Sequence, residues 1–217
     1  MKKIDFIGFV LDKEGSAKEI AFNEIDNYKK HDNLLWLHFN YTKAEAIEWI
    51  STKSGIDNIA VDALLVDETR PRTIVLGDNL LLALRGVNLD PNSKPEDMKS
   101  IRLYISENMI ISTSRRTILS VIEMIDELKK GVGIKSPSEF LVELTYKMID
   151  RIDSVIDKIH DRSDLLEDSI LESIKKNQRV EILNIRREII ILKRYLSPQK
   201  EALIKLYNEK ISWLNEY

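Results

Sequence analysis

Two long stretches of apolar residues at helical spacing fill the second half of this chain, and they constrain its fold more than any other feature. In both, most apolar residues lie three or four positions apart, as on one face of an α-helix. The first set is Phe140, Leu141, Leu144, Met148, Ile152, Val155, Ile159, Leu166 and Ile170. The second set follows Asn177 and comprises Ile182, Ile185, Ile189, Leu192 and Leu196. The pattern predicts one helix to about residue 174 and a second, antiparallel helix after it.

The ends of these helices carry further signals. Residues 136–139 (Ser-Pro-Ser-Glu) form a capping box, with an N-cap serine, proline at the first helical position and glutamate three residues after the serine. In the second helix Pro198 lacks a backbone N–H, and an interior proline costs a helix roughly 3 kcal/mol. The apolar phase still continues beyond it to Leu203 and Leu206. We therefore expect a continuous, kinked helix from Gln178 to the C-terminus.

The first half of the chain mixes strand-like and helical stretches. The strand-like runs are IDFIGFVLD, LLWLHFN, TIVLGDNLLLALRGVNL, IRLYI and MIIST. Helical spacing is found over residues 44–51, 58–66 and 117–129. Asp57 fits the N-cap of the second of these helices, and Gly-Val-Gly at 131–133 ends the third. The sequence therefore predicts an α/β domain over residues 1–133, followed by a pair of long helices over residues 134–217.

Composition and motifs exclude several classes of function. The 217 residues are 43% hydrophobic and 32% charged, which is typical of a globular protein, and the formal charge of −3 offers no basic field for nucleic acid. The absence of cysteine excludes disulfides and thiolate metal sites. No apolar run approaches the roughly 20 residues that cross a bilayer. Because no phosphate loop, nucleophile elbow or HExxH motif is present, we expect no enzymatic activity.

Aspartates recur along the first long helix at steps of three and four residues, which place them on one face. This aspartate row comprises Asp150, Asp153, Asp157, Asp161, Asp164 and Asp168. Like charges at this spacing destabilise a helix by roughly 0.2–0.5 kcal/mol per pair, so the row needs compensating charge. One source is the second helix, where basic residues recur every seventh position: Arg179, Arg186, Lys193 and Lys200. The other source is cations in solution.

His160 lies within the same helix, three residues after Asp157 and four before Asp164. An imidazole and two carboxylates are ligands that zinc accepts, although most surface histidines on charged helices bind nothing. The candidate metal-binding residues are His160, Asp153, Asp157, Asp161, Asp164 and Asp168. His38, in the run LLWLHFN, is expected to be a hydrogen-bonded structural residue.

Two segments carry a resemblance to a known family. Residues 62–116, from DALLVDETRPRTIVL to IISTSRR, and residues 186–203, RREIIILKRYLSPQKEAL, resemble in order the cytoplasmic region of the ZntB zinc transporters in the CorA metal-transporter superfamily. The resemblance implies an α/β/α sandwich with a mixed sheet, followed by two long antiparallel helices that form a funnel wall. It also implies a homopentamer at the inner (cell) membrane that transports zinc and other divalent cations, with zinc as a transported or regulatory ion.

The chain departs from that family in one respect. The stalk helix, the two membrane helices and the Gly-Met-Asn signature of the pore have no counterpart in these 217 residues. We therefore expect a fragment that would contact a membrane only through a further C-terminal segment. Two alternatives stay open: a magnesium or cobalt transporter domain of the CorA type, and a helical scaffold that binds no metal.

Overall fold

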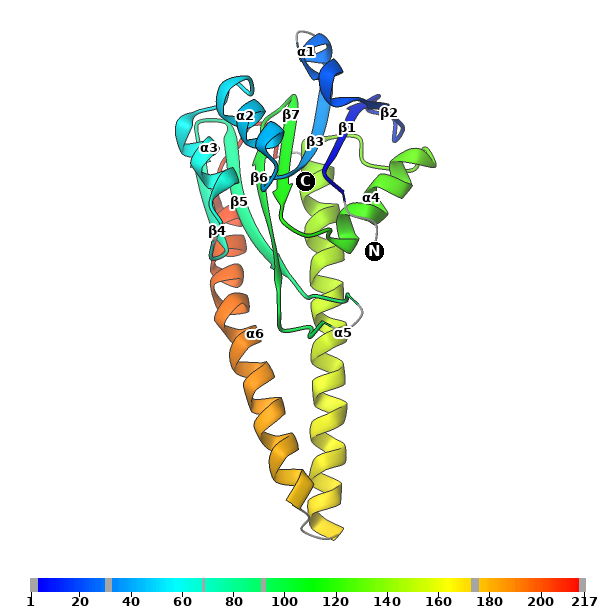
Figure 1. Cartoon of the computed structure of the whole chain (residues 1–217), viewed down its shortest axis with the longest axis vertical. Coiled ribbons are helices and arrows are strands. Elements are labelled where there is room, and N and C mark those ends of the chain that lie inside the picture. Colours follow the sequence, from blue (N-terminus) through cyan, green and yellow to red (C-terminus); the bar gives the residue numbers. More distant parts are fainter. Residues whose placement is uncertain (1–3, 30–32, 68, 91–92, 173–175, 215–217) are drawn as a thin grey trace.

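The computed structural model describes residues 4–29, 33–67, 69–90, 93–172 and 176–214. Its strands are β1 (Phe6–Leu11), β2 (Ala17–Ile20), β3 (Leu34–Asn40), β4 (Arg72–Leu76), β5 (Asn79–Gly86), β6 (Lys99–Ile105) and β7 (Met109–Ser114). Its helices are η1 (Phe22–Glu24), α1 (Ile25–Tyr28), α2 (Ala44–Thr52), α3 (Asn58–Leu65), α4 (Leu119–Lys129), α5 (Pro137–Glu172) and α6 (Lys176–Asn208). The sheet and short helices form one end of an elongated molecule, from which α5 and α6 project (Figure 1).

All seven strands belong to one mixed sheet in the order β2-β1-β3-β7-β6-β5-β4. The pair β3 and β7 is parallel, and the other neighbours are antiparallel. Each strand-like run of the sequence forms strand here, and the long run over residues 73–89 contains the hairpin of β4 and β5. Strand β2 was not expected, because its four residues, Ala-Lys-Glu-Ile, are too few and too polar to show an alternating pattern.

Helices cover both faces of this sheet, which confirms the α/β/α sandwich. On one face Leu37 and Phe39 of β3 pack in a core with α2 and α3. On the other face Trp36 packs with α4, the first turns of α5 and the end of the chain. Successive side chains of a strand point to opposite faces, so β3 supplies both cores and all seven of its residues are buried.

Helix α5 starts where the capping box predicts. The Ser136 hydroxyl accepts a hydrogen bond from the Glu139 N–H at 3.1 Å, while the Glu139 carboxylate accepts from the N–H of Lys135 at 2.7 Å, one residue before the serine. Phe140 and Leu144, in the first turns of α5, lie in the sheet core. The start of α5 is therefore near the expected boundary at residue 133, but the two regions share a core.

Helix α6 continues through Pro198, as the apolar spacing predicts. Two hydrogen bonds to the sheet hold it there: the Gln199 side-chain oxygen accepts from the Arg85 N–H, and the Thr73 hydroxyl donates to the Ala202 carbonyl oxygen, both at 2.7 Å. These contacts offset the hydrogen bond that the proline cannot donate.

The expectation that α6 reaches the C-terminus is wrong, because it ends at Asn208. Beyond that point the chain turns, and Ile211 and Trp213 are buried in the sheet core. The Trp213 indole N–H donates to the carbonyl oxygen of Asp78 at 2.7 Å. The helix ends where these apolar side chains reach the sheet. The spacing of apolar residues within the helix does not reveal this end point.

Away from the sheet, α5 and α6 hold each other through a narrow apolar seam and one charged cluster. Ile152, Val155 and Ile159 of α5 pack with apolar residues of α6. Farther along, Arg162 of α5 donates to Glu181 at 2.6 Å and to Glu188 at 2.7 Å, both on α6. These hydrogen bonds raise the pKa of Arg162, and the bond to Glu188 contributes more than the bond to Glu181.

Replacing Arg162 with methionine is expected to lower the free energy of unfolding by about 1 kcal/mol, because two carboxylates lose their partner in a pair that solvent still screens. Urea denaturation of the purified chain measures the change. Arg186→Met is the matched control, since Arg186 is exposed on α6 and makes no ion pair in the described part of the chain. Equal effects of the two substitutions would show that the cluster adds no stability.

His38 is buried in the sheet, in the structural role expected for it. Its Nδ1 lies 2.8 Å from the Ser112 hydroxyl and its Nε2 lies 3.2 Å from the Ser114 hydroxyl. Burial lowers the pKa of His38 from 6.5 to about 4. The folded protein therefore favours the neutral imidazole, and the stability that this gives is present above pH 6.5 and is lost as the pH falls toward 4.

We expect His38 to contribute about 2 kcal/mol of the stability lost between about pH 7 and about pH 5. Urea denaturation at the two pH values measures this loss in the natural chain and in His38→Gln, whose amide does not titrate and can still bond the two serines. The loss should be smaller in His38→Gln than in the natural chain. The same loss in both proteins would contradict the assignment.

Candidate metal-attracting face of the helix pair

The aspartate row lies on the outer side of α5. All six aspartates and His160 are exposed. Ile152, Val155 and Ile159 are buried on the side that faces α6. At 3.6 residues per turn, the aspartates project from the opposite side of the helix, toward solvent. The structure therefore confirms that the row shares one face.

The interpretation that α6 neutralises the row is wrong. The four basic residues that recur every seventh position are exposed, and no ion pair in the described chain joins them to the row. Each of them directly follows a buried position of α6: Gln178, Ile185, Leu192 or Gln199. A step of one residue turns a side chain by about 100°, so these cations point away from the seam.

The ion pairs between the helices have the opposite polarity, with arginine on α5 and glutamates on α6. The sequence analysis did not identify Arg162 or its partners Glu181 and Glu188. The sequence does contain a signal for this cluster: Arg162 lies three residues after the buried Ile159, and the two glutamates are seven residues apart. Recognising it requires the register of the two helices, because only the register shows which charges meet.

The row is a line of separated charges along a helix. Within the described ranges, no three histidine, aspartate or glutamate side chains are grouped so that they could hold a metal ion. Exposed carboxylates in a line raise the local concentration of counter-ions, which is a weaker effect than coordination. The metal role of His160 and the aspartates therefore stays a prediction.

An apolar groove of about 480 Å³ lies between α5 and α6, beside the row. Its lining includes Ile149, Ile156, Leu203, Ile204 and Tyr207, with Asp153 at its acidic edge. Tyr207 is 89% exposed and Ile204 51%. Such a surface suits the packing of another apolar segment and offers few ligands for an ion. In the part of the chain that the structure describes, no helix is long and apolar enough to cross a membrane.

The chain is similar in sequence to known proteins. A family model described as CorA-like Mg2+ transporter protein matches residues 31–217. The zinc transport protein ZntB of Klebsiella pneumoniae is 31% identical over 208 residues, which are 96% of this chain and 62% of that protein. The chain therefore spans less than two thirds of the length of this relative.

Two solved structures share the fold. The structure of the full-length CmaX protein has a TM-score of 0.88 at 33% identity and covers 99% of this chain and 66% of its own. The cytoplasmic domain of ZntB from Vibrio parahaemolyticus has a TM-score of 0.82 at 23% identity, over 97% of this chain and 83% of its own. The resemblance to ZntB is confirmed, and the family match runs from β3 through both long helices. The chain belongs to the CorA-like Mg2+ transporter family.

Proposed function

We propose that this chain is the cytoplasmic, funnel-forming domain of a divalent cation transporter of the inner (cell) membrane, with zinc as the expected ion. The observation that carries the proposal is the 31% identity to a zinc transport protein over 96% of the chain. Zinc is then a transported or regulatory ion and not a catalytic cofactor. The family is named for transport, and the proposal includes no enzymatic step.

We infer that the protein acts as a homopentamer in which the helix pair forms part of the funnel wall. The exposed apolar groove between α5 and α6 supports this, because apolar surface of this kind is stabilised by burial against another chain or segment. In this proposal residues 1–133 form the α/β/α unit of each subunit, and residues 134–217 form its helix pair. Contact with the membrane would come through a further segment, and nucleic acid is not an expected partner.

In this proposal the aspartate row, together with His160, attracts divalent cations to the outer face of α5. Its support is that the aspartates are exposed and have no ion pair within the described chain, so their negative charge is uncompensated. Cations would then bind weakly and exchange quickly, which suits concentrating or sensing an ion.

The two alternatives are each favoured by one observation. A magnesium or cobalt transporter domain is favoured by the description of the family model, which names Mg2+. A helical scaffold without metal is favoured by the absence of a chelating group among the described residues. Identity to ZntB over almost the whole chain ranks zinc transport ahead of both.

Titrating the chain with zinc should give weak binding, in the millimolar range, that disappears at high salt because exposed charges are screened. Asp157→Asn with Asp164→Asn should weaken binding by about threefold or more, since two of the charges beside His160 are removed. Calorimetry measures the affinity. Asp62→Asn with Asp126→Asn, which removes two exposed aspartates elsewhere, should bind as the natural chain does. No zinc response at millimolar metal would refute cation binding by the row and leave the family assignment intact.

Metal uptake separates the three candidate functions. Cells that produce the whole protein containing this chain should accumulate zinc faster than cells without it, and excess magnesium should compete poorly. Uptake of magnesium or cobalt without zinc would favour the CorA-type alternative. Uptake of no metal, with the protein present in the membrane fraction, would favour the scaffold.

A further inference from the structure

A polar cavity of about 610 Å³ lies where the parallel strands of the sheet end. Strands β3 and β7 finish side by side at Asn40 and Ser114. The residues that follow them, Tyr41, Arg115 and Arg116, line the cavity. In open α/β sheets, ligands bind in the crevice outside the carboxyl ends of parallel strands. The position and size of this cavity therefore fit a small-molecule site.

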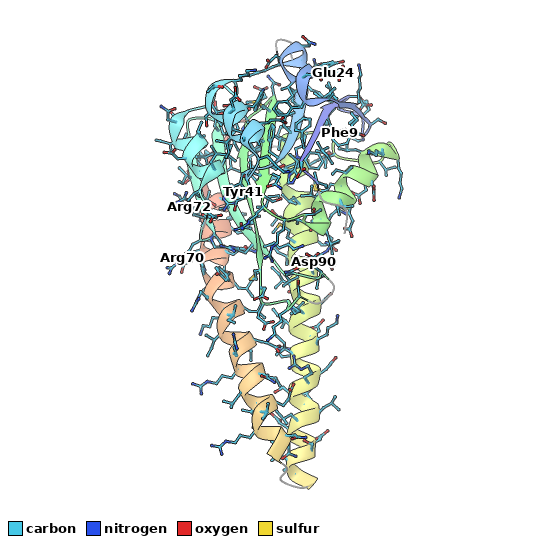
Figure 2. The ribbon with its side chains drawn as sticks, in the orientation of Figure 1. Phe9, Glu24, Tyr41, Arg70, Arg72 and Asp90 are labelled. Carbon is cyan, nitrogen blue, oxygen red and sulfur yellow. The ribbon has the colours of Figure 1, made fainter. Side chains whose placement is uncertain are left out.

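The walls of the cavity come from segments far apart in the sequence. Ile191 and Tyr195 of α6 line the cavity together with Arg85 of β5. The Arg85 guanidinium lies 4.6 Å from the centre of the Tyr195 ring. Figure 2 shows Tyr41 in the upper half of the molecule, at the level where α6 lies beside the sheet. Helix α6 thus completes the site that the sheet begins.

The cationic groups of the cavity are poorly neutralised. Arg85 donates to the carbonyl oxygens of Thr69 at 2.8 Å and Met98 at 3.2 Å, which carry no net charge. Arg115 is 65% exposed and forms one long ion pair, at 3.8 Å, with Asp67. Arg116 is exposed and has no ion pair in the described ranges. The exposed N–H donors of Arg115 and Arg116 can bind an anion, and arginine suits phosphate through paired N–H donors.

A buried arginine contacts two residues that line the cavity, although it lines a separate small cavity itself. Arg102 is 1% exposed, lies 4.4 Å from the centre of the Tyr41 ring and donates to the Asp67 carbonyl oxygen at 2.7 Å. Its Nε and Nη1 atoms have no hydrogen-bond partner among the residues that the structure describes. A buried cation without a counter-ion is costly, so an anion bound nearby would stabilise it.

The acidic residues of the cavity restrict the kind of anion. Lys99 is already paired with Asp90 at 2.9 Å, and Asp67 accepts from the Tyr41 hydroxyl at 3.1 Å. Glu96 and Asp97 line the cavity and have no ion pair in the described chain. Ionised carboxylates accept hydrogen bonds only, and in dinucleotide sites they bind ribose hydroxyls. A ligand with both a phosphate and hydroxyl groups would suit the two sets of side chains.

We propose that this cavity binds a small organic phosphate that carries sugar hydroxyls, with its phosphate at Arg115 and Arg116 and its hydroxyls at Glu96 and Asp97. Sugar phosphates and nucleotides share this chemistry. The site is distinct from the aspartate row and from the groove between α5 and α6. It goes beyond the proposed transport function and does not depend on which ion is transported.

Calorimetry of the 217-residue chain at low ionic strength tests the site with ribose 5-phosphate, AMP and inorganic phosphate. Both organic phosphates should bind with a Kd below about 1 mM, and inorganic phosphate about tenfold more weakly, because it lacks the hydroxyls. Arg115→Gln with Arg116→Gln should weaken the binding of ribose 5-phosphate by about tenfold or more, since charge-assisted bonds are lost. Both arginines are exposed, so the fold should be retained, which circular dichroism checks.

Two further variants make the test specific. Arg70→Gln removes an exposed arginine outside the cavity, at the edge of the molecule in Figure 2, and should bind as the natural chain does. Asp97→Asn should weaken the binding of ribose 5-phosphate and leave the binding of inorganic phosphate unchanged.

Equal affinity for ribose 5-phosphate and AMP would identify a sugar phosphate site, and tighter binding of AMP would identify a nucleotide site. The proposal would be overturned if neither organic phosphate bound at 10 mM, which corresponds to a binding free energy of roughly 3 kcal/mol or less. It would also be overturned if the double arginine variant bound ribose 5-phosphate as tightly as the natural chain does.

Discussion

The core shared between the sheet and the inner ends of the two long helices is the contact on which the rest of the structure depends. Phe140 and Leu144 of α5 and Leu206, near the end of α6, pack in the same cluster as Trp36 of β3. Burial of apolar surface is the main favourable term in folding, and a sheet with one bare face would not retain it. The helix pair therefore covers the sheet at one end and can project freely at the other (Figure 1).

Beyond the sheet, the two helices depend on each other. A seam that includes Val155 and Leu192 is narrow, so most of each helix surface stays in solvent and is available for charge. Charges that must meet across the seam are complementary, as Arg162 and its two glutamates are. Charges on the outer sides have no such constraint, so six aspartates can line one face without an ion pair to any described residue.

This division gives the molecule three different surfaces. The outer side of α5 is acidic, the groove between the helices is apolar, and the crevice at the strand ends is rich in arginine. Each surface suits a different partner: cations, another chain or segment, and an organic phosphate. Only the first was anticipated from the sequence, because it lies on a single helix. The arginine crevice combines Arg85 of β5, the two arginines that follow β7 and residues of α6, which no local pattern connects.

The sequence by itself determined the elements: the long helices, the passage through Pro198, the Asp57 cap, the alternation along β3 and the aspartate face. These depend on residues a few positions apart, within the reach of helical and strand periodicity. Only the tertiary structure decided the end of α6 at Asn208 and the crevice around Arg85. It also decided that the ion pairs between the helices involve Arg162 and not the aspartate row. These depend on the register between segments distant in the chain, which is set by how their apolar surfaces pack together.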